Sequence, residues 1–180
     1  MWPENSEHPL RRLFAGLTEQ TFLATLGIGD PPLIDYLSLL LARFIHMDAI
    51  YRLRNAQGKR LEEVADMMME AESFPPAGRT RREVFRHIGD VTLFWTGVYP
   101  EAIERLRSAF TKDHLLDYTR QGKRCYRIAS TYEDEPFKGE APVLRRLSDE
   151  FELCAYGLHQ VRREWERQQP EGLSSRLLGS

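Results

Sequence analysis

The side chains that could do chemistry concentrate around residues 87–100, HIGDVTLFWTGVYP, and the turn before them. Glu83, His87 and Asp90 lie at positions i, i+4 and i+7, a spacing that places them on one face of a helix. Two carboxylates and an imidazole on one face could bind a divalent metal or act as an acid-base pair. The spacing therefore predicts a candidate site, with Glu83, His87 and Asp90 as the candidate metal ligands.

The same residues also have a structural interpretation. Val84, Ile88 and Val91 form a neighbouring arc that we predict to be the core face of the helix. Polar residues beside such a face commonly bind each other or neighbouring helices. Carboxylate-bridged metal bundles carry paired Glu-x-x-His elements, and this sequence has none. We therefore predict no cofactor and keep a divalent metal as the alternative. Gly97 is suited to the left-handed position just past the helix end.

Asp48 and His114 are the two residues that could complete this polar cluster. Asp48 falls among apolar positions of a helix predicted over 31–54, where a carboxylate is costly unless it is paired. His114 borders the inward face of a helix predicted over 113–131. Buried polar residues of this kind are either functional or ties between helices, and both interpretations stay open.

Two basic clusters are candidates for binding an anionic ligand. Arg120, Lys123, Arg124 and Arg127 share the outer face of one predicted helix. A second cluster opens another helix and comprises Arg79, Arg81, Arg82 and Arg86. Acidic residues are interspersed with both clusters, so a solvated charged face is the alternative. The net charge of −2 gives no overall field that attracts nucleic acid or anionic lipid, and nucleic acid is an unlikely partner.

The two cysteines, Cys125 and Cys154, indicate a reduced core. Neither belongs to a CxxC pair, so no zinc or redox framework is predicted. Lys123, Arg124 and Arg127 could lower the pKa of Cys125. Its position on an apolar stripe favours an inert core thiol instead. Free thiols are typical of a reducing compartment, which favours the cytoplasm.

No sequence motif for a nucleophile or a nucleotide is present, and neither is a membrane span. The chain lacks GxSxG, the P-loop and GxGxxG. No stretch reaches the roughly 18 apolar residues of a transmembrane helix. The most apolar segment, LSLLLARFI, is interrupted by Arg43.

Apolar residues recur at helical spacing along nearly the whole chain, which predicts an all-α fold. At 180 residues the chain is expected to form a compact single-domain helical bundle of seven or eight helices. We expect a flexible N-terminus over 1–8, a helical domain over 9–168 and a flexible tail over 169–180. The predicted helices cover residues 10–17, 18–26, 31–54, 60–73, 80–96, 100–108, 113–131 and 142–168.

The sequence favours a non-enzymatic module that binds a protein partner or copies of itself. Small residues on helix faces, such as Gly122 and Ala155, permit close helix contact. Leu39 and the methionine run at 67–69 are candidate interface residues. The alternatives are the metal or acid-base site on Glu83, His87 and Asp90, and the binding of an anion by the arginine clusters.

Overall fold

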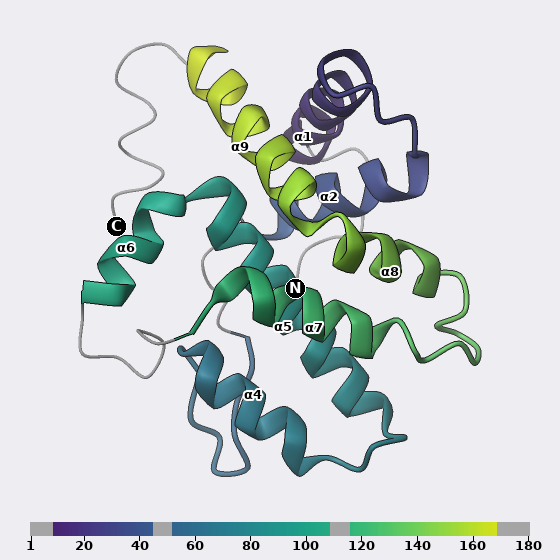
Figure 1. Ribbon diagram of the computed structural model, residues 1–180, viewed down its shortest axis with the longest axis vertical. Helices are drawn as coiled ribbons and strands as arrows, with labels where there is room; N and C mark the ends of the chain where they lie inside the picture. The colour runs from purple at the N-terminus through teal and green to yellow at the C-terminus, as the bar shows by residue number, and fades with distance from the viewer. Residues whose placement is uncertain (1–8, 45–51, 109–115, 169–180) are drawn as a thin grey trace.

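The computed structural model describes residues 9–44, 52–108 and 116–168, without the side chains of 105–108 (Figure 1). This part of the chain is all-α, as predicted, with eight α-helices and one π-helical segment. Asp48, His114 and both tails lie outside the described residues. The elements are α1 (Pro9–Gln20), η1 (Thr21–Thr25), α2 (Pro31–Phe44), α4 (Val64–Ser73), α5 (Arg79–Val98), α6 (Pro100–Ser108), α7 (Tyr118–Ala129), α8 (Ala141–Asp149) and α9 (Phe151–Gln168).

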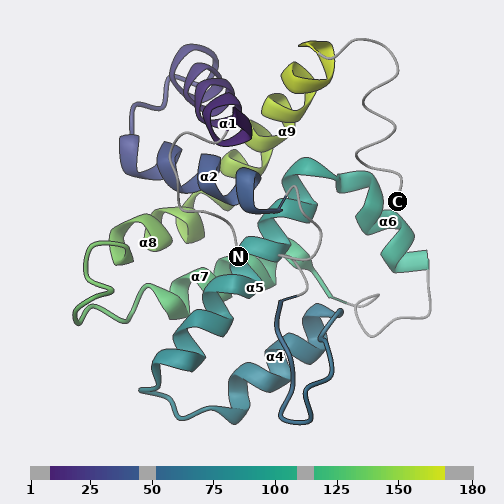
Figure 2. The same ribbon diagram turned by 180° about the vertical axis from the view of Figure 1, so that it is seen from behind.

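Helix α5 runs through the middle of the molecule, and the other helices pack around it. In Figures 1 and 2, α7 lies along one side of α5, α4 covers its N-terminal half, and α1, α2 and α9 gather at the opposite end. The predicted core arc of α5 is buried, but so is the neighbouring arc. His87, Asp90 and Phe94 are almost fully buried. The structure therefore places the polar stripe of α5 inside the protein, not at the border of the core.

Glycines let the central helices approach closely. A Cβ on Gly89 of α5 would lie 2.7 Å from the ring of Tyr126 on α7, and one on Gly122 of α7 would lie 2.5 Å from the Thr92 hydroxyl oxygen. Gly97 is similar, because its Cβ would lie 2.9 Å from the carbonyl oxygen of Ala155 on α9. The prediction that Gly97 ends its helix in a left-handed conformation is wrong, since α5 continues to Val98. Close packing explains this glycine.

The predicted helix over 31–54 is too long. Within the described residues α2 ends at Phe44, and Arg54 instead pairs with Arg60 in an isolated antiparallel bridge. The Asn55 side chain accepts hydrogen bonds from the backbone N–H groups of Gln57 and Lys59, and Gly58 has a φ of 79°. Asparagine competes with helical backbone bonding in this way, and the turn at Asn55 and Gly58 lies where the sequence predicts the helix to have ended.

Other predicted helix boundaries also differ. The predicted break at residue 18 is absent, because α1 runs to Gln20 and continues directly into η1. Helix α4 begins at Val64, not at residue 60. Helix α7 begins at Tyr118, where the Asp117 side chain accepts a hydrogen bond from the Arg120 N–H. The helix predicted over 142–168 is two helices, α8 and α9, that separate at Glu150.

Candidate functional site

The carboxylate of Asp90 is the centre of a buried polar cluster that joins three helices. Its side chain is fully buried. Oδ1 accepts hydrogen bonds from the hydroxyls of Tyr36 on α2 (2.6 Å) and Tyr126 on α7 (2.8 Å). Oδ2 accepts a hydrogen bond from Nη2 of Arg43 on α2 (2.6 Å) and lies 3.7 Å from Nη1 of Arg86 on α5. We call Asp90, Tyr36, Tyr126, Arg43 and Arg86 the Asp90 cluster.

Helical spacing explains how the chain brings these groups together. Tyr36 and Arg43 are seven residues apart on α2, so they lie on one face two turns apart. Arg86 precedes Asp90 by four residues on α5, which makes them neighbours on that helix. Tyr126 reaches Asp90 because Gly89 offers no side chain that would hold α7 away.

A second layer of ion pairs surrounds Arg86. Arg86 donates to Glu140 through Nε (3.0 Å to Oε2) and Nη2 (2.7 Å to Oε1). Arg82 binds the same Glu140 carboxylate and donates to Glu83 at 2.6 Å. The guanidinium of Arg82 also stacks on Phe137, 4.3 Å from the ring centroid. These contacts fasten the segment before α8 onto the first half of α5.

The electrostatics of the cluster favour an ionised Asp90. Burial alone would raise the pKa of this carboxyl, but the charges of Arg43 and Arg86 and the two tyrosine hydrogen bonds outweigh burial and lower the pKa below its usual value. Burial and the adjacent Asp90 charge raise the pKa of Tyr36 and of Tyr126 well above the usual range. Both tyrosines therefore stay neutral donors to a charged acceptor.

We expect acid to destabilise the protein through Asp90. Because its folded pKa is below its unfolded value, Asp90 contributes stability above an unfolded pKa of about 4, and this contribution is lost as the pH falls toward the folded pKa. Urea unfolding at a series of pH values measures this effect. The difference in unfolding free energy between wild type and Asp90→Asn should shrink below about pH 4. A difference that is constant down to the acid limit of folding would contradict this assignment.

Of the predicted metal ligands, the structure brings Asp90 and His87 into the core and leaves Glu83 nearer the surface. Glu83 is paired with Arg82. His87 is fully buried and packs edge-on to Phe44, with the ring centroids 5.8 Å apart. Among the described residues there is no group of three or more His, Cys, Asp or Glu side chains that could hold a metal ion. Asp48 and His114 lie outside the described residues, so the metal site stays a prediction.

The basic face of α7 is paired with acidic residues of neighbouring helices. Lys123 binds Glu152 of α9 at 2.9 Å, Arg124 lies 3.4 Å from Glu72 of α4, and Arg127 binds Asp149 of α8. A phosphate ligand at this face would compete with these carboxylates. Anion binding by Arg120, Lys123, Arg124 and Arg127 stays a prediction, and the pairing supports the alternative of a charged face that links helices.

The expectation that Cys125 is a core residue is confirmed. Cys125 and Cys154 are both fully buried free cysteines. Burial raises the pKa of each thiol to about 12, and the nearby Arg124 only partly offsets this for Cys125. Both sulfurs are therefore neutral at physiological pH and are poor nucleophiles.

Comparison with known proteins adds no relative from which a role could be carried over. No protein-family model, curated protein or solved structure matches this chain. The physical features of the chain therefore carry the functional argument. One such feature is negative: none of the helices in the described segments is long and apolar enough to cross a membrane.

Sequence reasoning identified Asp90 but missed four residues that bind it or its neighbours, namely Tyr36, Arg43, Tyr126 and Glu140. One signal was available. Arg43 interrupts the most apolar segment of the chain, and an arginine in such a segment needs a carboxylate partner when it packs against the core. Nothing in the sequence indicated that this partner was Asp90, 47 residues away.

Proposed function

We propose that this protein is a non-enzymatic helical module that associates with a second copy of itself through the outer face of α9. The observation that carries this proposal is the exposure of apolar side chains on and beside that helix. Leu153 is 40% exposed and Tyr156 is 54% exposed. Large exposed side chains are common singly, but neighbouring ones indicate an interaction surface.

The neighbouring segment η1 packs against α9 and carries a further exposed apolar side chain. Leu153 and Gly157 are four residues apart on α9, so they lie along one stripe of the helix. The ring of Phe22 packs where a Cβ of Gly157 would be, which places η1 against this stripe. The next residue of η1, Leu23, is 45% exposed. We call Leu23, Leu153 and Tyr156 the α9 surface, and no other described element crosses in front of α9 in Figure 1.

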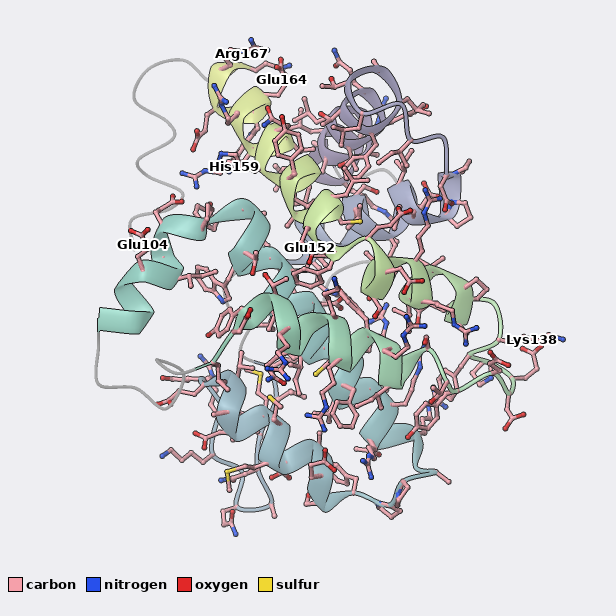
Figure 3. The ribbon with its side chains drawn as sticks, viewed as in Figure 1. Glu104, Lys138, Glu152, His159, Glu164 and Arg167 are labelled. Atoms are coloured by element: carbon pink, nitrogen blue, oxygen red, sulfur yellow. The ribbon has the colours of Figure 1, made fainter. Side chains whose placement is uncertain are left out.

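Charge along α9 favours a second copy of the chain as the occupant. The first turn of the helix is acidic, with Glu152, and its last turn is basic, with Arg167. Figure 3 shows Glu152 at one end of α9 and Arg167 at the other. A two-fold axis near Tyr156 generates a self-complementary contact. An antiparallel pair of α9 helices about such a centre opposes the two helix dipoles, and it sets Glu152 of each copy level with residue 160 of the other, close to the exposed Arg163.

The interior of the protein supports a binding role over a catalytic one. The oxygens of Asp90 are engaged by two tyrosines and an arginine, and both thiols are neutral at physiological pH. Asp90 and the two cysteines, which are three of the residues considered for chemistry, therefore serve helix connection or packing. A cytoplasmic location, suggested by the two free cysteines, belongs to the same proposal.

Sedimentation of the full chain over a concentration range tests the proposal. One helix pair buries a small interface, so we expect a weak dimer with a dissociation constant in the micromolar range. Tyrosine is a frequent anchor of interfaces. The double substitution Leu153→Ser and Tyr156→Ser should therefore weaken dimerisation at least about tenfold. Leu39→Ser tests the other candidate interface, since Leu39 of α2 is 41% exposed, and under this proposal it should leave dimerisation unchanged.

Two results would refute the proposal. One is a monomer at all concentrations, and the other is a dimer that the α9 substitutions do not weaken. A disulfide test checks the antiparallel geometry separately. A Tyr156→Cys chain should form a covalent dimer on mild oxidation, because a two-fold axis brings the two copies of residue 156 together, and a Leu39→Cys chain should not.

A further inference from the structure

Arg43 and Arg86 of the Asp90 cluster each have an N–H group that donates no hydrogen bond to a carboxylate. Arg43 and Arg86 both approach Oδ2 of Asp90, whose Oδ1 is already engaged by two hydroxyls. Arg86 donates Nε and Nη2 to Glu140, and its Nη1 lies 3.7 Å from Oδ2 of Asp90, which is too far for a hydrogen bond. The Nε of Arg43 is buried and has no hydrogen-bond partner among the described residues. A buried donor without an acceptor is costly, so an acceptor from outside the chain would be favoured here.

A third arginine, Arg52, lies within electrostatic range of these two. The charges of Arg43 and Arg86 act on its guanidinium, and together with burial, which is the largest effect, they lower its pKa. Arg52 forms no ion pair with any described residue. Four arginines (43, 52, 82 and 86) thus face three carboxylates (Glu83, Asp90 and Glu140), and one positive charge is uncompensated within the described part of the chain.

We propose that Arg43, Arg52 and Arg86 form a binding site for a small phosphate-class oxyanion. Each of these guanidiniums has donors left over, and planar guanidinium groups match the oxygens of phosphate. The site is reached by solvent, because the side chains of Arg43 and Arg86 are 27% and 17% exposed.

The Asp90 cluster holds two of the three arginines in place before any ligand arrives. Arg43 is fixed by Asp90 and packs over the ring of Phe44, with its guanidinium carbon 4.8 Å from the ring centroid. Arg86 is fixed by Glu140 and packs over Tyr36 at 5.1 Å. Such preorganisation lowers the entropic cost of binding. Asp90 does not repel the ligand strongly, because Arg43 pairs with its charge directly.

Titration of the full chain with inorganic phosphate, at constant ionic strength, tests the site. We expect saturable binding in calorimetry and a rise in the melting temperature. Arg52→Gln should weaken binding at least about tenfold, because it removes a charged donor without disturbing the Asp90 cluster. Arg54→Gln is the matched control, since Arg54 is an exposed arginine two residues along the chain, and its affinity should equal that of wild type. Titration with O-phosphoserine distinguishes free phosphate from a phosphate monoester as the preferred ligand.

Absence of saturable binding by wild type would overturn the proposal, and so would equal affinities of wild type and Arg52→Gln. Asp48→Asn tests whether a carboxylate of the chain, instead of an external ligand, supplies the anion at this site. If only Asp48→Asn bound phosphate, the chain itself would supply the anion and the proposal would be wrong. These measurements do not depend on α9, so the α9 surface and the arginine site can fail independently.

Discussion

Asp90→Asn is expected to lower the free energy of unfolding by about 3 kcal/mol, because it removes the charge that Arg43 and Arg86 share while leaving both arginines in place. Breaking a buried ion pair from one side leaves an uncompensated charge, and this cost exceeds the net contribution of the intact pair. Urea unfolding at neutral pH, followed by circular dichroism, measures the change.

Asp35→Asn is the matched control, because Asp35 is an exposed aspartate on α2, and its effect should lie within about 0.5 kcal/mol of zero. If Asp90→Asn does not fold, Tyr126→Phe provides the measurement, since it removes only one hydroxyl from the same carboxylate. That substitution should cost about 1–2 kcal/mol. Stabilities of Asp90→Asn and Tyr126→Phe equal to wild type would contradict a structural role for the cluster.

Gly122→Val is expected to destabilise the protein about as much as Asp90→Asn does, with a loss of about 3 kcal/mol in the free energy of unfolding. Gly122 lies where α7 meets α5 and α9, and its missing side chain leaves room for Thr92 and for Phe151, whose Cζ would lie 2.7 Å from an added Cβ. The larger side chain forces α7 away from α5. That displacement also moves Tyr126 away from Asp90. Thermal and urea unfolding measure the loss.

Gly16→Ala serves as the control, because it is expected to stabilise the protein. Gly16 is an exposed residue within α1, and an added Cβ there would meet nothing within 4 Å. Alanine is the better helix former, so this variant should be about 0.5–1 kcal/mol more stable than wild type. If Gly122→Val were tolerated as well as Gly16→Ala, the close contact of α5 with α7 would not hold in solution.

Helical periodicity was enough to predict the fold class. Along α9 the residues Leu158, Val161 and Trp165 form the predicted inward stripe, and all are buried. Helix ends were less predictable, because they depend on local bonding that competes with the helix. Asp117 caps α7 four residues after the predicted start of that helix, and the bridge between Arg54 and Arg60 occupies the end of the helix that was predicted over 31–54.

Only part of the Asp90 cluster was predictable from the sequence. Helical spacing placed His87 and Asp90 on one side of α5, and both are buried, but it gave no information on which helices face them. The partners Tyr36 and Tyr126 are 54 and 36 residues from Asp90, and their distance depends on how α2 and α7 cross α5. Gly89 and Gly122 determine how closely α7 approaches, and a sequence pattern does not reveal which ring fills the space above a glycine.

The Asp90 cluster connects the stability of the protein with the proposed arginine site. The same carboxylate that joins α2, α5 and α7 also positions Arg43, so substitutions of Asp90 should weaken phosphate binding as well as folding. The α9 surface lies outside the cluster, and its substitutions should leave the unfolding free energy of the monomer nearly unchanged.

A double-substitution cycle on Tyr36 and Asp90 tests the central claim most directly. Urea unfolding of wild type, Tyr36→Phe, Asp90→Asn and the double variant yields the coupling free energy between the two side chains. Because the hydroxyl of Tyr36 donates to Asp90 at 2.6 Å, the double variant should lose at least about 1 kcal/mol less than the sum of the single losses. Losses that add to within about 0.5 kcal/mol would mean that the two helices are not joined through this carboxylate.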